Sequence, residues 1–89
     1  MSVHQLGETT AVVTGASRGF GRAIAASFAE RGARVVGVAR SEPQLNDLRG
    51  QLGERFEPEV ADAADPSLPD RLLAQYKPQI VILNAGRPR

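Results

Sequence analysis

The chain has 89 residues and no cysteine, and its 11 Lys and Arg side chains nearly balance its 10 Asp and Glu side chains. This length allows a single domain with a thin core, and the lack of cysteine excludes a disulfide framework and a thiolate metal site. A net charge of +1 argues against nucleic acid or an anionic membrane as a partner. No apolar run is long enough for a membrane helix, and residues 1–8 lack the pattern of a secretory signal, so we expect a soluble, cytoplasmic domain.

Short β-rich runs alternate with helical patterns along the chain. Strands are predicted over residues 9–14, 33–39, 56–61 and 79–83. Helices are predicted over residues 19–31, from an N-cap at Ser41 to Gly53, and from an N-cap at Asp65 to a stop at Lys77-Pro78. Pro58 suits an edge position for the third strand, whereas the uninterrupted apolar run Ile80–Leu83 predicts a fourth strand covered on both faces. Four strands separated by three helices predict an α/β fold with a parallel sheet and right-handed crossovers.

A glycine-rich loop, Thr14–Gly21, joins the first strand to the first helix. Gly15 would let the chain turn off the strand, Gly19 would let the backbone approach a bound group, and Gly21 would let the helix pack tightly on the sheet. The free N–H groups and the positive dipole end of a helix at this point attract a pyrophosphate. The alternative is a turn that merely tolerates glycine, but the position between a strand and a helix of a βαβ unit favours nucleotide binding.

Three motifs carry a family resemblance. The loop has the spacing T-G-x-x-x-G-x-G, Asp62 follows the third strand, and Asn84-Ala85-Gly86 follows the fourth. In these motifs, which span the chain in the family's order, the sequence resembles the short-chain dehydrogenase/reductase family. The resemblance implies a Rossmann-type three-layer fold with strand order 3-2-1-4 and helices on both faces, in which residues 1–8 are an extension and residues 9–89 a partial NADP-binding domain. The cofactor-binding residues expected from the motifs and from the second strand's end are Gly15, Ser17, Arg18, Gly19, Phe20, Gly21, Arg40, Ser41, Asp62, Asn84, Ala85 and Gly86.

The end of the second strand indicates which dinucleotide is bound, because an acid there accepts a hydrogen bond from the adenosine ribose of NAD. This sequence has Ala39-Arg40-Ser41 at that place and no acid before Glu42. A guanidinium makes paired, charge-assisted bonds to a phosphate, so Arg40 is expected to bind the 2′-phosphate of NADP, with Ser41 as a further donor. Arg18 is the second basic position that NADP-preferring members of the family tend to carry. Both arginines could be solvated surface residues, but two of them at one expected site favour NADP over NAD.

Three further polar residues have competing interpretations. Asp62 is expected by resemblance to hold the adenine amino group, although it could be only a turn residue that closes the third strand. Asn84 is expected to tie neighbouring loops through its amide. Tyr76 is rejected as a catalytic base, because the family places a lysine four residues after its tyrosine and residue 80 here is an isoleucine in a strand.

The family's catalytic serine, tyrosine and lysine follow the fourth strand's loop. The resemblance therefore implies the cofactor-binding half of an NADP-dependent oxidoreductase that transfers hydride between a carbonyl and an alcohol. The alternative is a non-catalytic nucleotide-binding or regulatory module that keeps the same loop. By the family's strand order the fourth strand lies at a sheet edge, where unpaired backbone groups predict marginal stability, self-association or pairing with a second half.

Overall fold

A computed structural model describes residues 8–17, 19–62 and 64–84. The elements, in chain order, are β1 (Thr10–Thr14), α1 (Gly19–Glu30), β2 (Arg34–Ala39), α2 (Glu42–Leu52), the 3₁₀ turn η1 (Gly53–Arg55), β3 (Phe56–Val60), α3 (Leu68–Tyr76) and β4 (Ile80–Ile82). The four predicted strands and three predicted helices are all present. Among these residues, no helix has the length and apolar character of a membrane span.

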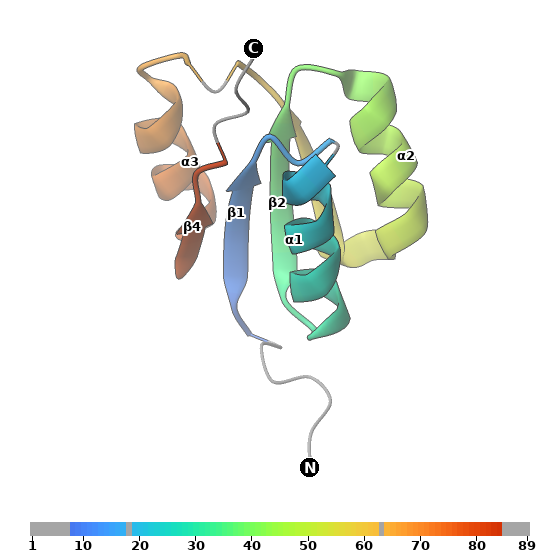
Figure 1. Cartoon of the computed structure of the whole chain (residues 1–89). Helices are drawn as coiled ribbons and strands as arrows, with labels where there is room; N and C mark the ends of the chain where they lie inside the picture. The colour runs from blue at the N-terminus through green and yellow to red at the C-terminus, as the bar shows by residue number, and fades with distance from the viewer. Residues whose placement is uncertain (1–7, 18, 63, 85–89) are drawn as a thin grey trace.

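The strands form one parallel sheet in the order β3-β2-β1-β4. Helices α1 and α2 cover one face of this sheet, and α3 covers the other (Figure 1). This is the predicted three-layer Rossmann-type arrangement with strand order 3-2-1-4. Pro58 lies in β3 at one edge, where a residue without a backbone N–H costs no ladder hydrogen bond on its open side.

Alternate residues of the central strands supply two separate cores. Val13 and Val35 point toward α1 and α2, while Val12 and Val36 point toward α3. This alternation follows from the two-residue period of a strand. Gly37 makes room on the α1/α2 side, because a Cβ there would overlap the ring of the fully buried Phe56. Nothing in the local sequence pattern marks this packing of β2 against β3.

The start of α3 differs from the prediction. Ser41 does cap α2, with its Oγ accepting from the Gln44 N–H at 3.3 Å. Asp65 does not cap α3, because its carboxylate accepts from the backbone N–H and the hydroxyl of Ser67, both at 2.9 Å, in a turn before the helix. These bonds hold the pKa of the Asp65 carboxyl below its ordinary value. The helix begins three residues later, at Leu68.

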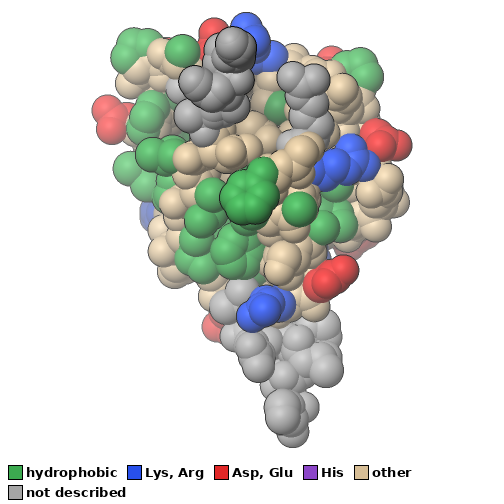
Figure 2. Space-filling model, in the orientation of Figure 1, with side chains coloured by type: hydrophobic (Ala, Val, Ile, Leu, Met, Phe, Trp, Pro, Cys, Tyr) green, Lys and Arg blue, Asp and Glu red, His purple; other side chains and the backbone are tan. Residues whose placement is uncertain are grey.

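The prediction that the fourth strand is covered on both faces is wrong. Ile82 packs against the α1/α2 core, but Val81 is 45 % exposed and Leu83 is 77 % exposed on the side of α3. The physical reason is the position of α3, whose buried leucines pack on Val12 of β1 and on β2 and do not reach across β4. Hydrophobic side chains accordingly gather at the surface on the side of the molecule where β4 and α3 lie (Figure 2).

Candidate dinucleotide-binding site

The loop between β1 and α1 requires glycine for its backbone path. Gly15 has φ +65° and Gly19 has φ +62°, which is the left-handed region that other residues rarely adopt. The Ala16 N–H donates to the Val38 carbonyl at 3.1 Å. This bond places the loop beside the carboxyl end of β2, where the residues expected to select the dinucleotide lie.

Gly21 allows the first turn of α1 to rest on the loop itself. A Cβ at Gly21 would lie 2.6 Å from Asn84 Nδ2 and even closer to the Gly15 carbonyl oxygen. The tight packing predicted for Gly21 is therefore present, but its closest partners are the loop and Asn84 rather than the sheet. Gly19, in contrast, has no neighbour among the described residues within 4 Å of its Cβ position, so these residues leave the outer side of the loop open.

The amino end of α1 suits an anion. Its first four N–H groups have no partner within the helix, and its first turn carries no acidic side chain. With the open space beside Gly19, these groups form the kind of cradle in which a helix N-terminus binds phosphate. Phe20, in this turn, is 75 % exposed and could border a bound group.

A hydrogen-bonded clamp joins this loop to the end of β4. The Thr14 hydroxyl oxygen accepts from the Asn84 N–H at 2.9 Å and lies 3.4 Å from the Asn84 carbonyl oxygen, to which it can donate. Asn84 Nδ2 donates to the Gly15 carbonyl at 3.4 Å. The side-chain amide of Asn84 thus ties two loops together as predicted, and Thr14 bonds across them.

Arg22 links the glycine loop to α2, a contact that the sequence did not reveal. Its guanidinium donates to the Ser17 carbonyl at 3.3 Å and to the Asp47 carboxylate at 3.0 Å. It therefore joins the glycine loop to α2. A basic residue in the first turn after the glycine loop is visible in the sequence, but its acidic partner lies 25 residues away and carries no motif.

The residues after β2 lie at the surface, as a ligand site requires. Arg40 directly follows β2 and is exposed. Ser41 Oγ acts as an acceptor in the cap of α2, which leaves its hydroxyl hydrogen free to donate. Glu42 lies in the first turn of α2, so no acid occupies the last position of β2, which is Ala39.

Asp62 follows β3 and is exposed, with Oδ1 accepting from the Ala64 N–H at 2.9 Å. Asp62 thus stabilises the turn after β3, which was the alternative interpretation of this residue. Within the described residues, its other carboxylate oxygen accepts no hydrogen bond. Arg18, Ala85 and Gly86 were also predicted to bind cofactor, and they lie outside the described residues.

Tyr76 has the environment of a structural residue. Its hydroxyl donates to the Glu59 carboxylate at 2.9 Å, and the Arg34 guanidinium lies 5.5 Å from the centre of its ring. Burial, together with the hydrogen bond to Glu59, raises the pKa of Tyr76 to about 12. A tyrosine that acts as a catalytic base needs a lowered pKa, so the raised pKa of Tyr76 agrees with the prediction that it is not catalytic.

Comparison with known proteins identifies the family. The sequence profile of the short chain dehydrogenase family matches residues 9–87, which is most of the chain and includes the glycine loop, Asp62 and Asn84. The chain belongs to this family. The clamp and the glycine loop described above both lie within the matched segment.

Three relatives show how far the likeness extends. The chain is 38 % identical over 84 residues to the 3-oxoacyl-[acyl-carrier-protein] reductase FabG of Escherichia coli K12, a match that covers 89 % of this chain and 34 % of that protein. It is 44 % identical over 57 residues to a probable NADP-dependent dehydrogenase of Haemophilus influenzae, covering 64 % of this chain and 23 % of that one. A short-chain dehydrogenase of Shigella flexneri, solved in complex with NADP, superposes with a TM-score of 0.81 at 27 % identity over 97 % of this chain and 41 % of its own. The chain thus spans about a third of the length of the first of these relatives.

Proposed function

We propose that this chain is the NADP(H)-binding portion of an oxidoreductase that transfers hydride between a carbonyl and an alcohol. The observation that carries the choice of NADP is the exposed Arg40 directly after β2, where Ala39 takes the place of the acid expected in an NAD-binding protein. The naming of the Haemophilus relative as NADP-dependent and the NADP in the Shigella structure support the same choice.

Each part of the site has a defined task in this proposal. The N–H groups at the start of α1 bind the pyrophosphate, and the Arg40 guanidinium pairs with the 2′-phosphate. Asp62, through its second carboxylate oxygen, accepts from the adenine amino group. Thr14 and Asn84 hold the loop around the cofactor in one conformation.

When bound, the nicotinamide supplies or accepts the hydride. This chain contributes binding and orientation, because the serine, tyrosine and lysine with which the family activates a carbonyl follow the segment matched here. By the same family resemblance, substrate choice belongs to the part that follows this segment in longer relatives.

The test is a titration of the chain with NADPH and with NADH. A charge-assisted hydrogen bond contributes about 1.5–3 kcal/mol, so Arg40→Gln is expected to weaken NADPH binding by about ten- to a hundredfold. NADH has no 2′-phosphate, so its affinity should change less than about twofold. Arg49→Gln, which removes an exposed arginine from the last turn of α2, is the matched control and should leave both affinities unchanged. Equal losses for NADPH and NADH in Arg40→Gln would refute the assignment.

A further inference from the structure

The two ends of the proposed cofactor site lie on different elements. The N–H groups that would bind the pyrophosphate belong to the start of α1, whereas Arg40 and Ser41 directly precede α2. Both helices pack on the same face of the sheet (Figure 1). A dinucleotide must contact both ends at once, so its affinity depends on how firmly α1 and the glycine loop are held relative to α2.

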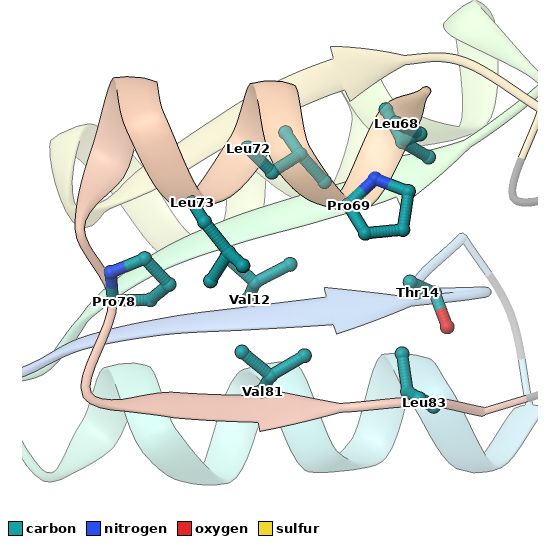
Figure 3. A pocket seen from close by; sticks show the side chains of 9 residues that line it. All are labelled: Val12, Thr14, Leu68, Pro69, Leu72, Leu73, Pro78, Val81 and Leu83. Carbon is teal, nitrogen blue, oxygen red and sulfur yellow. The ribbon is translucent and has the colours of Figure 1, made fainter. Parts of the chain in front are cut away.

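The groove on the opposite face of the sheet has the wrong chemistry for a phosphate. It has a volume of about 200 Å³ and lies between α3 and β4, with Val12 and Val81 as its floor and Leu72 and Leu73 as one wall (Figure 3). Thr14 is the single polar residue among the described residues that line it. The polar contacts that organise a dinucleotide site therefore lie on the face of α1 and α2.

The guanidinium of Arg22 bridges the glycine loop and α2. Its Nη1 donates to the Ser17 carbonyl at 3.3 Å, and its Nη2 donates to the Asp47 carboxylate at 3.0 Å. In the part of the chain that the structure describes, no other side-chain hydrogen bond joins α1 to α2. Because a guanidinium is a planar fork, it fixes the direction as well as the distance between its two partners.

Helix α2 carries the effect of this bridge to the expected phosphate ligands. Asp47 lies in the second turn of α2, and the start of the helix is fixed by Ser41. The Ser41 Oγ accepts from the Gln44 N–H at 3.3 Å, and the Ser41 carbonyl accepts from the Leu45 N–H at 3.1 Å. Leu45 and Leu48 hold the same helix in the core. A fixed position of Asp47 thus implies a fixed position of Ser41.

We infer that Arg22 is a positioning residue, which holds the pyrophosphate cradle and the ligands of the 2′-phosphate in one geometry. The loop is also attached to the end of β2, where the Ala16 N–H donates to the Val38 carbonyl. A single attachment leaves the loop free to turn about it, and the bridge from Arg22 to Asp47 supplies the second. The inference rests on the proposed function, because it requires a dinucleotide that spans both ends of the site.

Two simpler roles for Arg22 have different consequences. If Arg22 only attracted phosphate by its charge, removal of the neighbouring Asp47 carboxylate would raise the affinity for NADPH. A bridge gives the opposite sign, because Asp47→Asn weakens the link to α2. If Arg22 only stabilised the fold, its loss would weaken every ligand alike. The Arg22 and Asp47 side chains are 28 % and 65 % exposed, and an ion pair at such a surface contributes little to stability.

The test is a titration of the full chain with NADPH, with NADH and with adenosine 2′-monophosphate, which has the 2′-phosphate but no pyrophosphate. We expect Arg22→Gln to weaken NADPH binding about tenfold and Asp47→Asn to weaken it about threefold. Both variants should change the affinity for adenosine 2′-monophosphate less than about twofold, because this ligand contacts only one end of the site. Arg22→Lys keeps the charge without the fork, so it should bind NADPH about as weakly as Arg22→Gln.

Glu54→Gln is the matched control for Asp47→Asn, because Glu54 is an exposed acid in η1, beyond the carboxyl end of α2. It should leave the affinities for all three ligands unchanged, and circular dichroism of each variant confirms that it is folded.

Three results would overturn the inference: an NADPH affinity that rises in Asp47→Asn, full NADPH affinity in Arg22→Gln or Arg22→Lys, or equal losses for NADPH and adenosine 2′-monophosphate in Arg22→Gln. A wild-type chain that prefers NADH speaks only against the choice of NADP, and the effect of Arg22 is then measured with NADH. A wild-type chain that binds neither dinucleotide overturns the proposed function and the role of Arg22 together.

Discussion

The packing of Gly21 leads to the sharpest prediction about this protein, the effect of Gly21→Ala. Alanine favours a helix over glycine by up to about 1 kcal/mol, so in an open helix this change would stabilise the fold. At Gly21 the added Cβ would lie 2.6 Å from Asn84 Nδ2, whereas ordinary van der Waals contact begins at 3.4 Å. It would lie closer still to the Gly15 carbonyl oxygen, which belongs to the backbone and cannot rotate away.

The magnitude follows from these opposing effects. Forcing an extra carbon into a filled site costs about 1–3 kcal/mol, which exceeds the gain in helix propensity. We therefore expect Gly21→Ala to lower the free energy of unfolding by about 1–2 kcal/mol. Relief of the overlap must move α1 away from the glycine loop or break the bond between Asn84 and Gly15, so NADPH affinity should fall by at least about tenfold.

Urea unfolding followed by circular dichroism measures the first effect, and NADPH titration measures the second. Gly50→Ala is the matched control, because Gly50 is also helical but has no neighbour within 4 Å of its Cβ position in the part of the chain that the structure describes. This control should raise the free energy of unfolding by about 0.5–1 kcal/mol and leave NADPH affinity unchanged. If Gly21→Ala is as stable as Gly50→Ala and binds NADPH normally, the loop is not held by this contact and the reasoning is refuted.

Three other predictions concern cofactor choice, pH and assembly. Ala39→Asp places a carboxylate at the end of β2 and should shift the ratio of NADPH to NADH affinity toward NADH by at least about tenfold; an unchanged ratio in paired titrations contradicts it. Tyr76→Phe removes the hydrogen bond to Glu59 and should lower the free energy of unfolding by about 1 kcal/mol at neutral pH. The pKa of Tyr76 rises from 10.0 to about 12 on folding, so the wild type should be more stable than Tyr76→Phe below pH 10, and this difference in the free energy of unfolding should disappear between pH 10 and pH 12. A difference that stays constant over this pH range in urea unfolding contradicts the prediction. The isolated chain should be marginally stable or self-associate through β4; a monomer in sedimentation analysis with one cooperative thermal transition near about 45–65 °C contradicts it.

The correct sequence predictions share a physical origin in local pattern. Apolar residues three and four apart indicate the helices, runs of β-branched residues indicate the strands, and Gly15 indicates the turn at the end of the first strand. The strand order came from the family resemblance and not from periodicity. It is confirmed by the sheet.

The errors arose where several local arrangements have similar free energy. Asp65 followed by proline is a helix-start pattern, but the same carboxylate can bond to the N–H two residues later, and in this chain it does. An apolar run such as Ile80–Leu83 indicates burial on both faces only if a helix lies over each face. Which strands α3 covers depends on the direction of the crossover and cannot be read from the run itself.

By itself, the sequence determined the element order, the glycine loop at a helix start and a basic residue at the end of the second strand. Only the tertiary structure decided what those residues touch. Asn84 reaches the loop from 69 positions away in the chain, and Arg22 bonds to Asp47 on a different helix. Such contacts depend on how strands are ordered and which face each helix covers, because a parallel sheet brings together the ends of strands that are distant in sequence. The open groove beside β4 has the same origin, since it reflects where α3 lies and not which residues the strand contains.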